Sequence, residues 1–343
     1  MNYYVGLDIH KTFCHATIMA EDGTIVKSGR IEANEKKLQQ FFIGIENAEV
    51  VIEASGMWEP YYNLLERLGY QVVLSHPLKT RVIAEARVKT DKIDSQILAH
   101  LLRADLLPRS YIPPKNIREL RNIVRHRIFL VRNATRMKNK IRAELLKRGW
   151  KRKDIFTTQG KQWLRSLEID EITSCLSVLD QLFLEIKRSN EKITSLTLQN
   201  DQARILTTIP GIGYYSALLI VSEIGDVMRF PSSGKLCAYA GLVPSVHQSG
   251  MYQRYGHITK TGSKYLRWIL VEAVHSHVRF SKSSHLTHYY NRLWRRKGKK
   301  VAVVATARKM LKVIYWMLKE QKPFRVKGEL RAVNCREGFN LPS

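Results

Sequence analysis

The sequence is poor in acidic residues relative to basic ones. Its 343 residues include 30 Asp or Glu against 57 Lys or Arg, which gives a formal net charge of +27 at pH 7. Such an excess favours a polyanionic partner, and nucleic acid is the first candidate because each neutralised phosphate releases counterions. Hydrophobic residues still make up 44% of the chain. We therefore expect a globular protein rather than a disordered one.

The sequence also lacks the features of membrane, secreted and zinc-binding proteins. No apolar run approaches the ~20 residues that span a bilayer, and the N-terminus has no basic segment followed by an apolar region. The four cysteines, Cys14, Cys175, Cys237 and Cys335, are far apart and form no C-x-x-C pair. This spacing argues against a zinc knuckle and against a disulfide framework. The sequence therefore predicts a protein of the reducing cytoplasm.

The hydrophobic pattern changes twice along the chain and predicts three regions. Residues 1–112 alternate short β-prone runs with helical segments, which indicates a mixed α/β sheet. Residues 113–202 contain a long basic helix, with fifteen Lys or Arg against two acids between residues 115 and 153. Residues 203–343 are expected to be mostly helical and are again basic between residues 292 and 327. The predicted fold class is thus α/β followed by an all-α part.

The second half of the central region has the spacing of a coiled-coil seam. Its apolar positions follow a 3-4 pattern that includes one polar residue of the kind that fixes register: Leu176, Leu179, Phe183, Ile186, Asn190, Ile193 and Thr197. Two long helices of this kind fit a coiled-coil hairpin that could also join protomers. An ordinary helical bundle core is the alternative.

Four acidic residues occupy positions that favour a metal site. Asp8 lies within an apolar strand and Glu53 ends another, and a buried carboxylate must be paired or bind a cation. Asp91 and Asp94 share one face if their segment is helical. Together the four could hold two Mg²⁺ ions for phosphoryl transfer, because Mg²⁺ prefers oxygen ligands. Taken singly, Asp91 could be only a helix cap and Glu53 only a surface charge.

Two segments of the third region could contact nucleic acid. Gly211 and Gly213 permit the tight turn of a helix-hairpin-helix, whose backbone N–H groups can hold a phosphate; a plain turn is the alternative. Ser249 precedes a glycine in a loop-like stretch, and its hydroxyl could attack phosphorus, although Tyr252 and Tyr255 offer rival hydroxyls. Four cations follow as candidate nucleic-acid contacts that could stabilise the developing charge: Arg254, Lys260, Lys264 and Arg267.

The order of these motifs resembles one family of mobile-element enzymes. The segments Gly6–Lys11, Ile52–Gly56 and Lys89–Ser95 resemble the RuvC-like (RNase H-like) DEDD domain of the insertion sequence one-hundred-ten family of transposases, which are relatives of the Piv DNA invertase. The segments Ile209–Gly213 and Pro244–Arg267 resemble that family's C-terminal transposase domain. The resemblance extends over most of the chain.

The resemblance implies roles for five residues. The family's four metal-binding acids fall on Asp8, Glu53, Asp91 and Asp94, and the serine that links covalently to DNA falls on Ser249. It also implies a structured guide RNA, often called a bridge RNA, whose loops pair with donor and target DNA. A homodimer, with a tetramer at synapsis, and a site shared between protomers are further implications. We therefore expect an Mg²⁺-dependent, RNA-guided recombinase that excises and inserts its mobile element from double-stranded DNA at the bacterial nucleoid.

Two other functions fit the same residues. In a RuvC-like junction endonuclease, metal-activated water would cut the DNA and Ser249 would be structural. In a non-catalytic nucleic-acid-binding protein, the helix-hairpin-helix and the basic helices would bind and the acids would be structural remnants. Ser249→Ala separates the first alternative from a recombinase, and Asp8→Asn separates the second.

Overall fold

The computed structural model describes residues 2–84, 90–249 and 252–325, and the chain divides into two compact units, residues 1–113 and 114–343. Gly250, which follows the candidate serine, and the basic residues beyond 325 lie outside the described residues. Cys14, Cys175 and Cys237 have free thiols. Within the described ranges, no helix is both long enough and apolar enough to cross a membrane.

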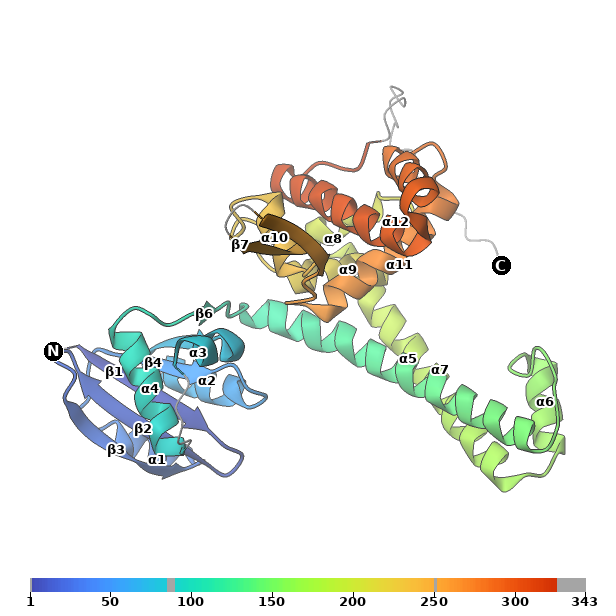
Figure 1. Cartoon of the computed structure of the whole chain (residues 1–343). Coiled ribbons are helices and arrows are strands. Elements are labelled where there is room, and N and C mark those ends of the chain that lie inside the picture. The colour runs from blue at the N-terminus through green and yellow to red at the C-terminus, as the bar shows by residue number, and fades with distance from the viewer. Residues whose placement is uncertain (1, 85–89, 250–251, 326–343) are drawn as a thin grey trace. The chain divides into compact units, whose positions relative to one another are not determined.

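The first unit is built on a mixed sheet, which confirms the predicted α/β class for this region (Figure 1). Its described strands are β1 (Tyr3–Ile9), β2 (Phe13–Ala20), β3 (Ile25–Glu32), β4 (Ala48–Glu53), β5 (Gln71–Ser75) and β6 (Arg109–Ser110). Their spatial order is β3-β2-β1-β4-β5-β6. The first three form an antiparallel meander, β4 and β5 add parallel to β1, and β6 returns antiparallel. This arrangement is consistent with a RuvC-like domain.

Helices cover both faces of this sheet. On one face, α1 (Glu35–Phe41) and α2 (Trp58–Arg67) pack in a cluster that includes Leu7 and Ile52. On the other face, α4 (Asp91–Arg103) crosses the central strands over a smaller cluster that includes Val51. The neighbouring residues Val51 and Ile52 thus point to opposite faces, as strand alternation requires. Both faces are buried, which explains the almost continuous apolar runs of β1 and β4.

Two of the helix starts in the first unit, those of α1 and α4, test the capping signals in the sequence. Asn34 caps α1 as its position suggests, because its side chain accepts a hydrogen bond from the backbone N–H of Lys36. For α4 the suggested cap was wrong. Thr90 is the cap and accepts from the N–H of Ile93, while Asp91 is the first helical residue. The side chain of Asp91 is thereby left available for other partners. The helix α3 (Pro77–Ile83) follows β5 directly.

The second unit begins with a helical hairpin. The helices α5 (Lys115–Lys147) and α7 (Asp170–Leu198) pack antiparallel along each other, and α6 (Thr158–Ser166) lies between them in the chain (Figure 1). The suggested seam residues Leu176, Leu179 and Ile193 are buried. The polar seam residue Asn190 accepts a 2.7 Å hydrogen bond from Nε of Arg127 on α5. Coiled-coil geometry and a role in dimerisation stay predictions.

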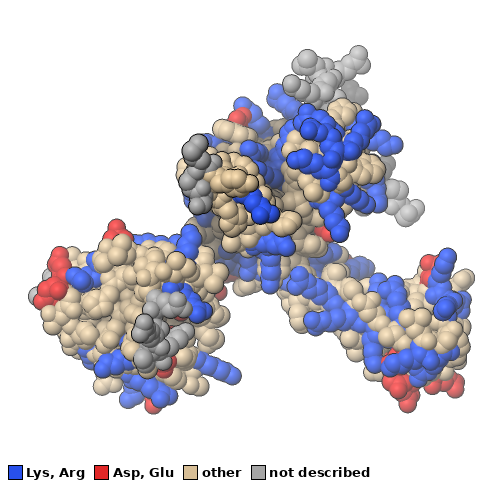
Figure 2. Space-filling model, viewed as in Figure 1, with Lys and Arg blue, Asp and Glu red and all other residues tan. Residues whose placement is uncertain are grey.

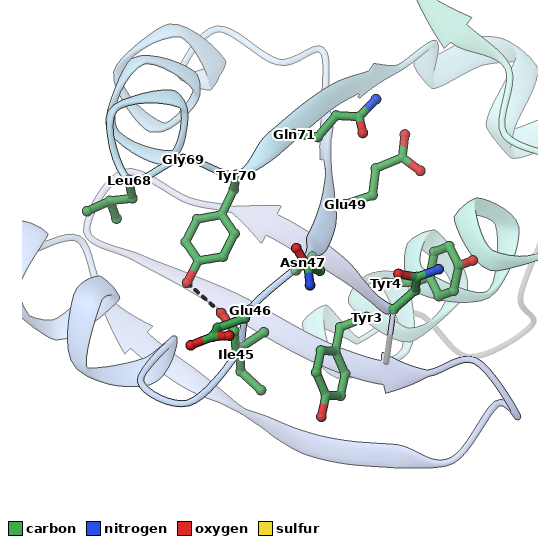
Figure 3. A pocket seen from close by; sticks show the side chains of 12 residues that line it. Tyr3, Tyr4, Ile45, Glu46, Asn47, Glu49, Leu68, Gly69, Tyr70 and Gln71 are labelled. Atoms are coloured by element: carbon green, nitrogen blue, oxygen red, sulfur yellow. Dashed lines mark hydrogen bonds between the residues drawn. The ribbon is translucent and has the colours of Figure 1, made fainter.

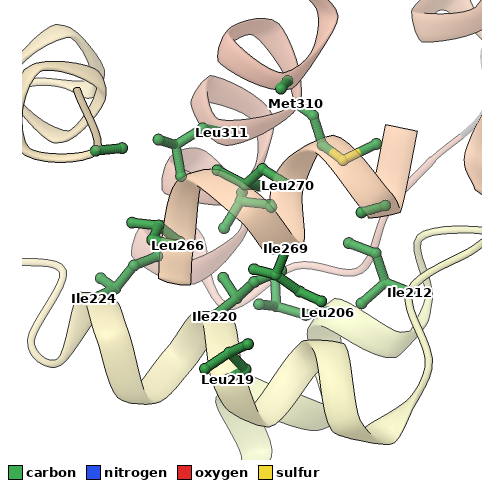
Figure 4. Packing of buried hydrophobic residues seen from close by; sticks show 14 of the residues in the cluster. Leu206, Ile212, Leu219, Ile220, Ile224, Leu266, Ile269, Leu270, Met310 and Leu311 are labelled. Carbon is green, nitrogen blue, oxygen red and sulfur yellow. The ribbon is translucent and has the colours of Figure 1, made fainter. Parts of the chain in front are cut away.

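The rest of the second unit packs around one apolar helix. Its helices are α8 (Asp201–Thr207), α9 (Tyr214–Ile224), α10 (Ser233–Tyr239), α11 (Lys264–Phe280) and α12 (His285–Glu320). Every residue of α9 from Ala217 to Ile224 is buried, and a helix that is apolar on all sides lies at the centre of a core. Residues of α8, α11 and α12 surround it, among them Leu206, Leu270 and Met310 (Figure 4).

The third region is mostly helical, as expected, but it also contains two strands that an all-α part does not include. The strands β7 (Pro244–Ser249) and β8 (Tyr252–Ile258) pair antiparallel as a two-stranded ribbon in the segment expected to be loop-like. The β-prone residues Val246, Tyr252 and Tyr255 explain the ribbon. Their side chains are exposed, so the segment lacks the buried alternation by which strands are usually recognised.

Candidate active site

The carboxylates of the first unit are placed by the register of its central strands. Leu7 of β1 pairs with Ile52 of β4, so Asp8 and Glu53 are the next residues of two adjacent parallel strands. They occupy the same edge of the sheet, where β1 and β4 end. Strand alternation puts both on the face opposite to Leu7, which is the face that α4 covers.

A glycine lets α4 approach this edge closely. A Cβ atom on Gly6 would lie 2.0 Å from the carbonyl oxygen of Ser95 and 2.7 Å from the amide nitrogen of Ala99. Both are backbone atoms of α4, so rotation of a side chain could not relieve the overlap. Gly6 therefore permits the contact that carries the first turn of α4, with Asp91 and Asp94, to the end of β1.

Three side chains converge there. Nε2 of His10 lies 3.2 Å from Oδ2 of Asp8 and 3.2 Å from Oδ1 of Asp91. One potential ligand atom from each of the three residues lies within 4.8 Å of the others. The Asp8 side chain is 16% exposed, whereas those of His10 and Asp91 are 40% and 44% exposed. The group is thus anchored inside the fold and open on one side.

The electrostatics of this group favour a cation. Burial raises the pKa of the Asp8 carboxyl above its ordinary value, since a buried carboxylate loses hydration. His10 opposes this shift in pKa, and the negative charges of Asp91 and Asp94 add to it. A divalent ion would offset both the burial and the repulsion, and carboxylate oxygens are the donors that Mg²⁺ and similar ions prefer. The residues present therefore fit a bound metal ion.

Two of the four candidate acids lie beside this group rather than in it. Asp94 belongs to the first turn of α4, and its charge acts on Asp8. Glu53 is the last residue of β4. His10 was not recognised as a possible ligand from the sequence. Its position two residues after Asp8 was the available signal, because residues two apart in an extended chain share a face.

Ser249 is the last residue of β7 and belongs to the second unit, as does the rest of the ribbon. It pairs with Tyr252 across the ribbon, and His247 pairs with Arg254. Directly opposed residues of an antiparallel pair share a face, as do residues two apart in one strand. Positions 247, 249, 252 and 254 therefore fall on one face. Tyr252 and Arg254 are exposed there.

The other candidate nucleic-acid contacts differ in whether their side chains already have partners within the protein. Lys260 is exposed, and Lys264 begins α11 with its Nζ 5.4 Å from the centre of the Tyr265 ring. Arg267 instead donates from Nη1 to the carbonyl oxygen of Ala240 at 2.9 Å. Part of its guanidinium thus has a structural role.

The two glycines of the suggested helix-hairpin-helix turn also differ. Gly211 has φ +89°, and a Cβ there would lie 2.6 Å from the backbone nitrogen of His277 on α11. Gly213 precedes α9 and has open space around it. Packing against α11 alone therefore accounts for Gly211, and phosphate binding by this turn stays a prediction.

A buried carboxylate that the sequence analysis missed holds this unit together. Glu223 of α9 is 1% exposed and accepts hydrogen bonds of 2.8 and 3.0 Å from Arg125 of α5. It also accepts one of 2.7 Å from Oγ of Ser263, the cap residue of α11. Arg121 donates to the carbonyl oxygens of Ser222 and Glu223. These bonds join α5, α9 and the start of α11, directly after the ribbon.

A large hollow lies away from the acids. It has a volume of about 630 Å³ and is lined by residues at the starts of β1, β4 and β5, among them Tyr3, Glu49 and Gln71 (Figure 3). The candidate acids Asp8 and Glu53 lie at the opposite ends of β1 and β4. None of the candidate site residues lines the hollow, so volume alone does not identify the site.

Comparisons with known proteins identify the family of the chain. A family model of the DEDD domain of IS110 elements, described as "Transposase", matches residues 5–149, and a model described as "Transposase IS116/IS110/IS902 family" matches residues 203–291. The chain is 26% identical to the transposase for insertion sequence element IS1111A of Coxiella burnetii over 94% of its length and 91% of that protein. It is also 26% identical to the pilin gene-inverting protein of Moraxella bovis, over 94% and 97% of the two chains.

The two family models together match well over half of the chain, in the expected order. The chain therefore belongs to the IS110 family of transposases.

Proposed function

We propose that this protein is a DNA recombinase that excises and inserts a mobile element by transferring DNA strands through a serine-linked intermediate. The convergence of Asp8, His10 and Asp91 at the end of β1 carries the proposal. It supplies a partly buried, negatively charged group, open on one side, in the part of the chain that matches the DEDD family model.

The carboxylates have the first task in this scheme. Asp8 and Asp91, with Asp94 and Glu53 beside them, would hold one or two Mg²⁺ ions against a phosphodiester. A bound divalent ion polarises the phosphate and stabilises charge on the leaving oxygen. His10 lies between the carboxylates of Asp8 and Asp91, with its Nε2 3.2 Å from an oxygen of each, and would limit their repulsion.

Ser249 has the second task. Its Oγ bonds to the phosphorus of a DNA strand, the serine proton leaves to a base, and one sugar oxygen departs as a hydroxyl. Attack by a hydroxyl of another strand on the same phosphorus reverses these steps, restores the serine and joins the new strands. Arg254, on the same face of the ribbon as position 249, would stabilise the negative charge on phosphorus.

Sequence recognition would be delegated to a guide RNA that pairs with donor and target DNA. Figure 2 shows Lys and Arg spread over the visible face of the second unit with few Asp or Glu between them, as a surface that binds nucleic-acid backbones requires. In this scheme residues 1–112 form the metal-binding domain, residues 113–202 the dimerising helices and residues 203–343 the serine domain. Dimers, paired at synapsis, would bring the two DNAs together.

The proposal is tested with purified protein, Mg²⁺, the guide RNA and both double-stranded DNAs. Denaturing gels detect protein–DNA adducts, and sequencing detects joined strands. Ser249→Ala should abolish both, Asp8→Asn should abolish both, and the matched control Tyr252→Phe should retain both because it removes only the rival hydroxyl opposite position 249.

Other results would refute parts of the scheme. Cutting without an adduct by Ser249→Ala protein would favour a RuvC-like endonuclease that uses activated water. Strand joining by Asp8→Asn protein, or joining in excess chelator, would refute the role of the carboxylates and favour a binding protein without catalytic acids.

A further inference from the structure

The long C-terminal helix is interrupted at one residue. Within α12, Gly298 has φ +78° and ψ 166°, which are not helical values. A Cβ atom on this glycine would meet nothing within 4 Å, so lack of space does not explain the glycine. Its positive φ does, since residues with side chains rarely adopt it. The break is therefore encoded in the chain at this residue.

The chain around the break lies outside the core. Tyr290 and Ala302 are buried, but none of the eleven residues between them is. Six of those eleven are exposed cations, and none is acidic: Arg292, Arg295, Arg296, Lys297, Lys299 and Lys300. Among the described residues, no ion pair joins any of the six to an acid. Their charge is therefore available to a partner.

Several other cations of the same unit are paired with acids. Lys140, Lys147 and Arg148 surround Glu144, and Lys161 pairs with Asp180. Figure 2 shows the densest group of Lys and Arg over the C-terminal helices. The cations at the break differ from these paired cations in lacking acidic partners.

An aromatic ring lies in the middle of these cations. Trp294 is 53% exposed. One helical turn before it, the buried Tyr290 contacts it with ring centres 6.1 Å apart, and one turn after it comes Lys297. The indole of Trp294 therefore packs against Tyr290 on one side, while much of its remaining surface is exposed to solvent.

We propose that this break in α12 is a binding site for unpaired nucleotides of DNA or RNA, with a base stacked on Trp294 and the cations on the flanking phosphates. The inference rests on the proposed function, in which the protein handles both nucleic acids. Cations alone suffice for a duplex backbone. The bases of a duplex are already stacked on each other, so an exposed indole gains a partner only from an unstacked base.

The same helix offers a matched control. Trp316 is 51% exposed, nearly the same as Trp294. It lies farther along α12, beside Tyr315 and Lys319, and outside the run of unpaired cations. If exposure of a tryptophan were enough to bind a base, the two would contribute equally.

The test measures the affinity of the full chain for three labelled probes. They are oligothymidylate and oligouridylate of about 12 nucleotides, within the range of about 4–16 nucleotides that single-strand sites cover, and a duplex of similar length. Trp294→Ala should weaken binding of the single strands about tenfold, because one stacked base contributes roughly that factor. Duplex binding should change less than about twofold by the same reasoning. Trp294→Phe should retain most of the affinity, and Trp316→Ala should match the unaltered protein for every probe.

A second readout does not depend on the ring. Replacing Lys297 and Lys300 by Gln should flatten the dependence of log affinity on log salt for single strands by about 0.7 per cation that reaches a phosphate. A larger loss for oligouridylate than for oligothymidylate would identify RNA as the bound strand, and the reverse would identify DNA.

Two results would overturn the proposal: unchanged single-strand affinity in Trp294→Ala protein, or an equal loss for the duplex. If that variant melts at a lower temperature, an unchanged salt slope in the Gln variant overturns it instead. All binding is measured with the Ser249→Ala substitution also present, because binding requires no covalent chemistry. A failure here therefore leaves the recombinase proposal intact, and a failure of that chemistry leaves this test valid.

Discussion

Gly6→Ala tests how the fold brings the carboxylates together. The added Cβ would lie 2.0 Å from the carbonyl oxygen of Ser95, whereas an ordinary carbon–oxygen contact is about 3.3 Å or longer. The first turn of α4 must therefore move away from β1 by roughly 1.3 Å, carrying Asp91 and Asp94 away from Asp8. Overpacking of this kind destabilises a protein by about 1–3 kcal/mol. A displacement of about 1 Å at a reacting centre lowers rates roughly a hundredfold.

The assay combines thermal unfolding, with and without Mg²⁺, and strand cleavage of DNA. The protein should still fold, but with a smaller stabilisation by Mg²⁺ and with cleavage near the limit of detection. Gly29→Ala is the matched control, because its Cβ would lie 3.6 Å from Cε2 of Phe41, an ordinary contact in the same sheet. Cleavage by Gly6→Ala protein at the level of Gly29→Ala protein would refute the argument that close approach of α4 builds the site.

Three further predictions concern buried or clustered charges. The pKa of Asp8 in the folded protein is raised, so without metal its ionisation lowers the stability of the protein as pH rises above the pKa of the unfolded chain. Asp8→Asn should therefore raise the melting temperature in chelator at pH 7 and abolish the rise in melting temperature that Mg²⁺ produces. A variant that Mg²⁺ still stabilises would contradict this. The pKa of Glu144 is lowered to about 2, from 4.5, by hydrogen bonds from Lys140, Lys147 and Arg148. Its contribution is therefore complete above pH 4.5 and is lost as pH falls toward 2; a circular dichroism titration should show Glu144→Gln protein to be less stable than the unaltered protein at pH 6 and equal to it near pH 2. Glu223→Ala leaves Arg125 without its carboxylate and should cost roughly 2–4 kcal/mol in urea unfolding, because one partner of a largely buried pair is removed; a loss under about 1 kcal/mol would contradict the central role of Glu223.

The sheet and its acids could be predicted because local signals and burial agree there. The strands around Asp8 and Glu53 are apolar on both faces, and Asn34 has the residue type and position of a cap. The four acids were named from residue type and spacing and from the family resemblance. That Asp8 and Asp91 meet at His10 depends on the register of β1 against β4 and on Gly6. No local pattern contains that information.

The ribbon and the Glu223 network were missed for physical reasons. A strand that exposes both faces, as β8 does, has no hydrophobic alternation to reveal it. Glu223 lies in an otherwise apolar helix, and its partners Arg125 and Ser263 are 98 and 40 residues away in the chain. A buried carboxylate in such a helix suggests a partner, but the sequence does not name it.

The arginines of α5 limit how much of the formal charge can act on DNA. Arg121 and Arg125 donate to α9, and Arg127 donates to Asn190 of α7, so three guanidinium groups of the most basic segment point into the protein's own structure. Ionic strength that detaches nucleic acid from exposed lysines should leave these partly buried contacts in place, because screening acts weakly on them. The folded protein should consequently withstand high salt, and its affinity for a polyanion should correspond to considerably fewer charges than +27.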